Sequence, residues 1–214
     1  MKKSKLITCV SICCISILFG SLAVPANAYK IWMNGGNKGT YIHFYAWSGF
    51  ADETKHQFDL AFDEWNYKAG AVKPSSLWID WSGTDTNQTT AFVRNNKNEI
   101  TKGSRGTSGP STYTMATSAT YYVKEGGKNK LVEVDIDVNG SYPWVNSVQS
   151  GKLFVQNSFT HEVGHIYGLA DVYNSSEYTG TRPTMYGYAE YGGRSKCSIE
   201  ADDKAGLKSI YGGQ

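Results

Sequence analysis

The spacing of hydrophobic and polar residues predicts alternating strands and helices. Aromatic and β-branched residues fill the segment 40–47, which indicates a strand. In the segment 54–69, apolar residues recur at the spacing of one helix face, so we expect a helix. The positions that set this spacing are Phe58, Ala61, Phe62 and Trp65.

The middle of the chain favours strands and loops. The runs 77–81 and 89–93 indicate two short strands separated by a polar turn. The segment 104–118 is rich in glycine, serine and threonine, which favours a surface loop or a weak edge strand. In the segment 131–138, valine and isoleucine alternate with acidic residues, so we expect a strand with one buried and one solvated face.

Two more helices are expected in the last third of the chain. The first runs over about 151–167, and apolar residues recur along its inner side. The second runs over about 199–211 and carries carboxylates in its first turn, where they interact favourably with the positive helix end. No repeat or linker divides the chain, which favours one domain.

The first 28 residues have the three-part pattern of a secretory signal peptide. A basic start precedes a mostly apolar run over 6–24, and Ala26 and Ala28 are the small residues that cleavage requires. We expect cleavage after Ala28, a secreted, extracellular mature chain and no membrane insertion after cleavage. The next segment, 29–38, is rich in glycine and asparagine, so we expect a loosely held terminus ahead of the domain 39–214.

Loss of the signal changes charge and cysteine content. The formal net charge of +2 becomes −1 because the signal carries three lysines and no acid. A nearly neutral chain lacks the basic footprint of nucleic-acid-binding proteins, so we expect no such partner. Of four cysteines only Cys197 remains, as an isolated reduced thiol. We expect a monomer stabilised by its own core.

One run of residues combines metal ligands with an acid–base group. His161 and His165 are four residues apart, so on a helix both imidazoles can reach one zinc ion. Glu162 lies beside them, where it can accept a proton from a metal-bound water and pass it to a leaving amine. Zinc would lower the pKa of that water and polarise the scissile carbonyl. The pattern predicts one catalytic zinc ion.

A catalytic zinc site usually has a third protein ligand. Gly168 can end the helix in a left-handed conformation without a Cβ penalty. The chain can then turn sharply and bring the Asp171 carboxylate towards the ion. We therefore expect His161, His165 and Asp171 to bind the metal.

This run resembles the metzincin zinc endopeptidases, whose signature H-E-x-x-H-x-x-G-x-x-H is followed by a methionine-containing turn. Thr184-Met185-Tyr186-Gly187 resembles that turn, and the segment 199–212 resembles the terminal helix of the matrixin branch. The strand 132–138 with the loop at Trp144 is similar to the substrate-binding edge strand of matrixins. Matrixins carry histidine at the position of Asp171, and snapalysin-type bacterial proteases carry aspartate. The resemblance favours a bacterial matrixin-like enzyme whose third ligand, Asp171, is similar to that of snapalysin, and the choice between the two branches stays open.

The resemblance implies an α+β fold of the zincin type. It would contain a twisted, mostly parallel five-stranded sheet with helices, an active-site helix, and a small C-terminal subdomain with the methionine turn. The upper subdomain would extend to about residue 168 and the lower one over 169–214. Met185 would be a packing floor under the metal. Tyr186 and Tyr188 would line a substrate pocket or simply pack.

Other metal sites have weaker support in the sequence. Matrixins carry structural metals, but His43 and His56 lack neighbouring ligands, so we expect no second zinc. Calcium is possible, although alternating acids on a strand are more often its solvated face. The acids that could supply oxygens are Asp80, Asp85, Asp135 and Asp137.

These features predict a secreted zinc-dependent endopeptidase that hydrolyses peptide bonds in protein or peptide substrates. The alternative is a non-catalytic, secreted zinc-binding interaction module with a metzincin fold. The intact Glu162 argues against it, because loss of the base is the simplest route to an inactive protein. A carbohydrate-binding module, suggested by six tryptophans and fifteen tyrosines, does not explain the ordered motif.

Overall fold

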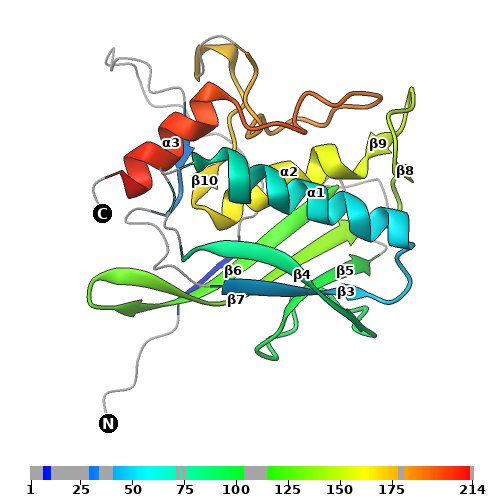
Figure 1. Cartoon of the computed structure of the whole chain (residues 1–214), viewed down its shortest axis with the longest axis horizontal. Coiled ribbons are helices and arrows are strands. Elements are labelled where there is room, and N and C mark those ends of the chain that lie inside the picture. The colour runs from blue at the N-terminus through cyan, green and yellow to red at the C-terminus, as the bar shows by residue number, and fades with distance from the viewer. Residues whose placement is uncertain are drawn as a thin grey trace.

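The computed structural model describes residues 7–10, 29–33, 41–70, 73, 76–103, 115–177 and 181–212. A mixed sheet forms its centre, in the strand order β1-β6-β7-β5-β3-β4 (Figure 1). The strands are β1 (Ile7–Val10), β3 (Tyr41–Trp47), β4 (Trp78–Thr86), β5 (Asn98–Gly103), β6 (Ala116–Glu125) and β7 (Lys128–Asn139).

Five of these strands lie after the expected signal peptide. The neighbours β7–β5, β5–β3 and β3–β4 are parallel, and β6–β7 is antiparallel. The prediction of a mostly parallel five-stranded sheet in an α+β arrangement is therefore confirmed at this level. The sixth strand, β1, falls within the expected signal and pairs antiparallel with β6.

Helices α1 (Asp52–Lys68) and α2 (Val155–Ile166) cover one face of the sheet, and α3 (Ala201–Tyr211) lies near the C-terminal end (Figure 1). All three fall within the ranges expected from apolar spacing or start slightly earlier. The core between α1 and α2 is aromatic: the Phe58 and Phe159 rings stack at 4.0 Å, and the Trp65 and Tyr167 rings at 5.4 Å. The Trp65 indole also donates to the Thr160 carbonyl at 2.7 Å. These contacts fix the position of α2.

No described helix has the length and apolar character needed to cross a membrane.

Two predictions about strands are wrong. The run 89–93 is a turn, and Phe92 has a φ of 59°, in the left-handed region that a strand cannot contain. The strand at 132–138 is not an edge strand, because β7 pairs with β5 on one side and β6 on the other. Among the strands after residue 28, β6 is the edge next to β7. Of the expected loop 104–118, residues 104–114 lie outside the described part, and 116–118 begin β6.

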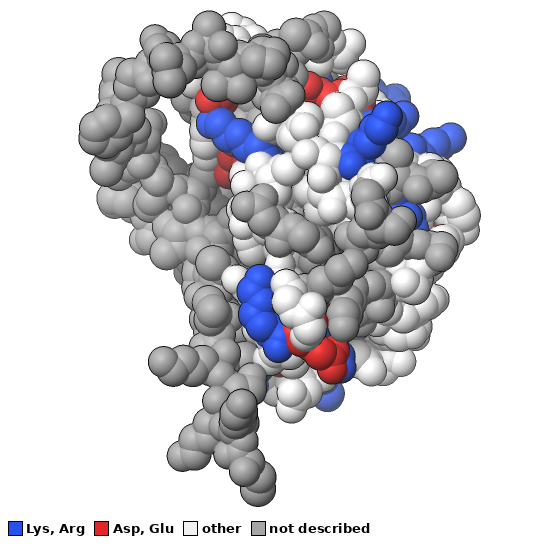
Figure 2. Space-filling view, turned by 90° about the vertical axis from the view of Figure 1, so that its left-hand side faces the viewer, with Lys and Arg blue, Asp and Glu red and all other residues white. Residues whose placement is uncertain are grey.

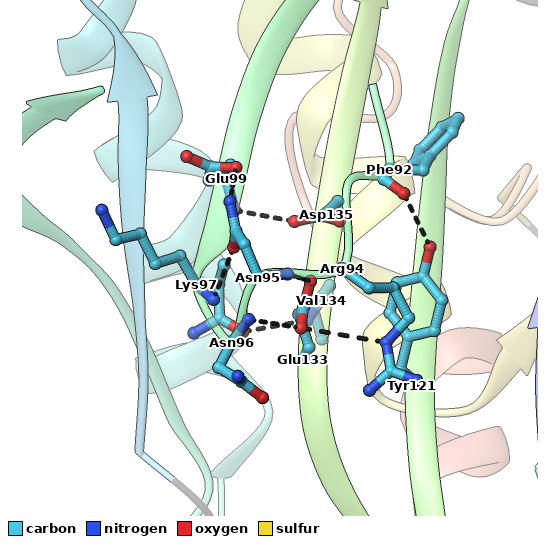
Figure 3. Close-up of polar contacts among 11 residues, drawn as sticks. Phe92, Arg94, Asn95, Asn96, Lys97, Glu99, Tyr121, Glu133, Val134 and Asp135 are labelled. Atoms are coloured by element: carbon cyan, nitrogen blue, oxygen red, sulfur yellow. Dashed lines mark hydrogen bonds and ion pairs between the residues drawn. The ribbon is translucent and has the colours of Figure 1, made fainter. Parts of the chain in front are cut away.

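The acidic face of β7 is not solvated, contrary to the prediction. Glu133, Asp135 and Asp137 are at most 1% exposed. The loop before β5 folds over Glu133, as Figure 3 shows: the Glu133 carboxylate accepts the backbone N–H groups of Asn95 at 3.2 Å and Asn96 at 2.8 Å. Asp135 and Asp137 instead accept hydrogen bonds from residues of β5, the strand next to β7. Carboxylates that accept hydrogen bonds can be buried. The alternation of acidic and apolar residues along β7 therefore does not indicate a solvated face here.

The four acids considered for calcium lie in separate hydrogen-bonded pairs. Asp80 accepts from the Tyr41 hydroxyl at 2.5 Å, and Asp85 lies 2.8 Å from the Lys55 ammonium. Asp135 accepts the Glu99 N–H, and Asp137 accepts the Thr101 hydroxyl; these two bonds are 3.0 Å and 2.7 Å long. The structure does not bring the four together, and calcium remains a prediction without a located site.

The described part of the N-terminal segment is docked rather than loosely held. β2 (Lys30–Ile31) pairs antiparallel with β10 (Leu169–Ala170). The Trp32 indole donates to the His165 carbonyl at 2.9 Å, and Met33 is only 2% exposed. The glycine and asparagine content of the segment does not indicate this pairing, because the partner strand β10 is far away in the sequence. Residues 34–38 fall outside the described part.

Charged groups on the face drawn in Figure 2 are mixed in sign. The visible lysine and arginine side chains stand in separate groups, and two of these groups adjoin acidic side chains. The pair Lys30–Glu177, at 2.5 Å, is one such combination in the described part of the chain.

Candidate metal centre

Helix α2 carries three of the four predicted chemical groups. Phe159 and Val163 are fully buried against the core, which turns the opposite side of the helix towards the C-terminal segment. His161, Glu162 and His165 are 7%, 7% and 6% exposed. The two imidazole rings lie 5.0 Å apart at 85°. The helical spacing therefore places both histidines as predicted.

Gly168 makes the turn that follows α2. Its φ of +95° lies in the region that favours glycine, and a Cβ there would lie 3.2 Å from the Met33 Cβ. Its carbonyl accepts the Trp32 N–H at 3.0 Å. Gly168 thus has two functions, since it reverses the chain and leaves room for the docked N-terminal segment.

Asp171 lies against both histidines. One ligand atom from each of His161, His165 and Asp171 lies within 4.8 Å of the others. Asp171 Oδ1 is 3.0 Å from His161 Nε2 and 3.7 Å from His165 Nε2. Among the described residues, no other group of three His, Cys, Asp or Glu side chains converges in this way.

The other ring nitrogens are held by carbonyl groups. His161 Nδ1 lies 2.8 Å from the Thr184 carbonyl, and His165 Nδ1 lies 2.9 Å from the Leu169 carbonyl. A carbonyl oxygen can only accept, so both Nδ1 atoms carry the proton, and in the neutral rings both Nε2 lone pairs face the Asp171 carboxylate. The two Nε2 lone pairs and the Asp171 carboxylate therefore converge on one point, where a cation would interact favourably with all three groups. The donor set therefore fits zinc.

The methionine turn lies directly against α2. Met185 is 2% exposed, and a Cβ on Gly164 would lie 2.2 Å from its Sδ. The Asp203 carboxylate accepts the Thr184 and Met185 N–H groups at 2.9 Å and 3.2 Å. Burial raises the pKa of Asp203, and these hydrogen bonds oppose the rise. One acid of α3 therefore holds the turn whose carbonyl orients His161.

Tyrosines surround Asp171 on its other side. The Tyr173 hydroxyl donates to Asp171 Oδ2 at 3.1 Å, and the Tyr173 and Tyr188 rings lie 5.3 Å apart. The Tyr186 and Tyr188 rings lie 5.5 Å apart, and Tyr188 is 57% exposed. The two predicted tyrosines form an aromatic cluster next to the candidate metal ligands. Gly187 permits it, because a Cβ there would lie 2.4 Å from the Tyr173 ring.

Sequence reasoning missed several supporting residues. Gly164 and Gly187 are ordinary glycines in sequence, and only the close approach of Met185 and Tyr173 reveals their use. Asp203 was noted only as a first-turn acid of the last helix. Tyr173, two residues after Asp171, had no motif to single it out.

Cys197 is a buried free thiol, as predicted. Burial raises the pKa of the Cys197 thiol to about 12, so it is protonated at neutral pH. Its sulfur lies 3.8 Å from Asn157 Oδ1 and is not among the converging metal ligands.

No protein-family model matches the chain, and no curated protein matches it significantly. The chemistry of this centre is therefore argued from the His161, His165 and Asp171 geometry and from the groups that hold it.

Proposed function

We propose that this chain is a secreted zinc-dependent endopeptidase of metzincin type. The observation that carries the proposal is the convergence of His161, His165 and Asp171 beside Glu162 at the end of one buried helix. Two histidines and a carboxylate form a common ligand set for catalytic zinc. When bound, zinc supplies a Lewis acid that polarises a carbonyl group and acidifies water.

Glu162 is the group proposed to move the proton. It follows His161 directly on α2, and it is 7% exposed. One of its carboxylate oxygens would take a proton from the attacking water and deliver it to the leaving amine nitrogen. The ligand histidines are not available for this, because each Nδ1 is held by a carbonyl and each Nε2 would bind the metal.

The edge strand β6 is the proposed substrate platform. Its outer edge already pairs with an extended segment of this chain, from Ile7 opposite Tyr122 to Val10 opposite Ala119. An edge that accepts one antiparallel strand can accept a peptide by the same main-chain hydrogen bonds. We therefore propose β6 as the substrate-binding strand instead of β7, which the resemblance had suggested.

The non-catalytic zinc-binding module remains the second candidate. A casein or gelatin assay on the mature chain, with and without a zinc chelator, separates the two. We expect chelator-sensitive cleavage that Glu162→Ala abolishes and that the exposed control Glu53→Ala retains. Folded, zinc-loaded protein that cleaves no member of a broad peptide library would contradict the enzyme.

The third ligand is tested separately from activity. Asp171→Ala should lose most bound zinc, as measured by elemental analysis after dialysis. The exposed control Asp52→Ala should retain it. Full zinc occupancy in Asp171→Ala would refute the ligand assignment and leave the fold untouched.

A further inference from the structure

A small cavity lies at the end of the sheet where the parallel strands β5 and β7 finish. Its volume is about 100 Å³. Figure 1 shows that α1 and α2 both begin at this end of the sheet, and the first turns of the two helices line the cavity through Thr54 and Val155. In α/β sheets, ligands commonly bind in the crevice beyond the carboxyl ends of the parallel strands.

This cavity is separate from the candidate metal centre. Val155 is the first residue of α2, and His165 follows it after ten residues, which corresponds to about 15 Å along the helix axis. Neither candidate ligand histidine lines the cavity. A molecule bound there would therefore not occupy the metal centre.

The inner wall of the cavity is apolar. Phe58 stacks on Phe159 at 4.0 Å and meets Phe50 edge-on at 5.2 Å. Val138 and Val155 complete this wall, and each is 4% exposed. All five side chains belong to the hydrophobic core. Because they offer no hydrogen-bonding group, this part of the cavity suits an aliphatic group and disfavours a polar one.

A lysine stands at the mouth of the cavity. Lys102 lines it from the end of β5 and is exposed to solvent. Ile100, two residues earlier, is fully buried in the core, so Lys102 points to the same helix-covered face of the sheet. Its carbon chain lies over Gly140, where a Cβ would be 3.1 Å from Lys102 Cε. Among the described residues, no acid forms a salt bridge with this ammonium group.

An amide adds a second donor to the lining. Asn146 Oδ1 accepts the Thr54 hydroxyl at 3.1 Å, which orients the Asn146 amide so that its nitrogen is the remaining donor. No acidic side chain lines the cavity within the part of the chain that the structure describes. The polar side of the cavity therefore combines an ammonium group with an amide donor.

The N-terminus of α2 reinforces the positive potential. The first turn of α2 contains no acidic residue, and no described side chain caps it. The N–H groups of a helical first turn lack acceptors within the helix and carry partial positive charge. Helix α1 does carry Asp52 and Glu53 in its first turn, but both are exposed and neither lines the cavity. The potential at the mouth thus favours an anion.

We propose that this cavity binds a short aliphatic carboxylate. The carboxylate accepts hydrogen bonds from the Lys102 ammonium and the Asn146 amide, and the aliphatic chain lies against Phe58, Phe159 and Val138. The volume limits the chain, because a cavity of roughly 150 Å³ is needed for benzene and this one admits about three to five carbons. The inference depends neither on zinc nor on the proposed peptidase activity.

An NMR titration of the nitrogen-15-labelled mature chain tests the proposal without any variant. The probes are sodium acetate, butyrate and isovalerate, with isovaleramide as the uncharged match and sodium chloride as the salt control. We expect isovalerate to shift the first-turn amides of α2 and the Trp144 indole, which lines the cavity, with a Kd in the millimolar range. Acetate and isovaleramide should bind at least about 10-fold more weakly.

Two outcomes of this titration would overturn the proposal. One is the lack of a saturable shift with all three carboxylates. The other is equal binding of isovalerate and isovaleramide, which would exclude a role for the charge. The titration is run with and without zinc, because carboxylates also bind zinc ions. Shifts that require zinc would assign the binding to the metal centre and contradict the cavity.

Variants assign the binding to the cavity. Lys102→Met should weaken isovalerate binding at least about 10-fold and leave isovaleramide binding unchanged. Lys68→Met, which removes an exposed lysine at the other end of α1, should bind both as the wild type does. Val138→Ile adds one methylene to the apolar wall and should weaken isovalerate binding at least about 10-fold relative to acetate. Wild-type isovalerate binding in both Lys102→Met and Val138→Ile would refute the site.

Discussion

The contact between Gly164 and Met185 allows a quantitative test of how the methionine turn supports α2, the helix that carries the two histidines. In Gly164→Ala, the new Cβ would lie 2.2 Å from Met185 Sδ and 2.9 Å from a Trp65 ring carbon. Ordinary carbon contacts are about 3.5–4.0 Å, so side chains or backbone must shift. Overpacking of this kind costs about 1–3 kcal/mol. Alanine also favours a helix over glycine by about 1 kcal/mol.

These opposing effects predict a net loss of about 0–2 kcal/mol for Gly164→Ala, which alone is a weak test. The double-mutant cycle with Met185→Ala is stronger. Met185→Ala should cost about 2–5 kcal/mol because Met185 is 2% exposed. With the thioether removed, Gly164→Ala should become less costly by about 1–2 kcal/mol or even stabilising.

Urea unfolding of all four proteins, with zinc removed, gives the free energies of unfolding. Competition with a chromogenic chelator then measures zinc affinity, which Gly164→Ala should reduce because the shifted turn carries the Thr184 carbonyl that holds His161. A coupling energy within about 0.3 kcal/mol of zero would refute the steric argument.

Three further predictions concern a buried acid of the sheet and two residues beside the candidate metal centre. Asp135→Asn should stabilise the protein at pH 8 by about 1–4 kcal/mol and change its stability little at pH 4, because burial, reinforced by neighbouring carboxylates, raises the pKa of Asp135 to about 7 from 3.8. The stability that this group contributes is complete below pH 4 and is lost as the pH rises through 7. Melting curves at both pH values check this prediction. Tyr173→Phe removes the 3.1 Å hydrogen bond to Asp171 and should weaken zinc binding about 10-fold in chelator competition, and unchanged affinity would exclude that role. Gly168→Ala should destabilise the fold by at least about 1 kcal/mol in urea unfolding, because φ is +95°, and a neutral effect would contradict the need for glycine.

The local parts of the centre could be predicted from the sequence. The step from His161 to His165 and the turn at Gly168 are properties of a few consecutive residues, and helical geometry converts them directly into positions. The apolar spacing of α1 and α2 was also readable, because each helix buries one continuous side against the same aromatic core.

The parts that depend on distant partners could not be predicted. The acids of β7 alternate as solvated residues do, and only distant partners explain their burial. These partners are the loop at Asn95 and Asn96 for Glu133, and strand β5 for Asp135 and Asp137. Strand order decides which strand is an edge, and no spacing within β7 reveals that β6 lies outside it. Asp203 likewise acts through hydrogen bonds to Thr184 and Met185 that no local sequence pattern predicts.

The pairing of β2 with β10 has a consequence for the order in which the chain folds. Ile31 lies opposite Leu169, so this contact closes a loop that spans well over half of the chain. Contacts of such separation form late, after local helices and hairpins have reduced the entropy of closure. The two histidines belong to one short helix and can be in place early. The turn that carries Asp171 is held in place only when the segment 30–33 docks against it. We therefore expect zinc uptake to report the final step of folding.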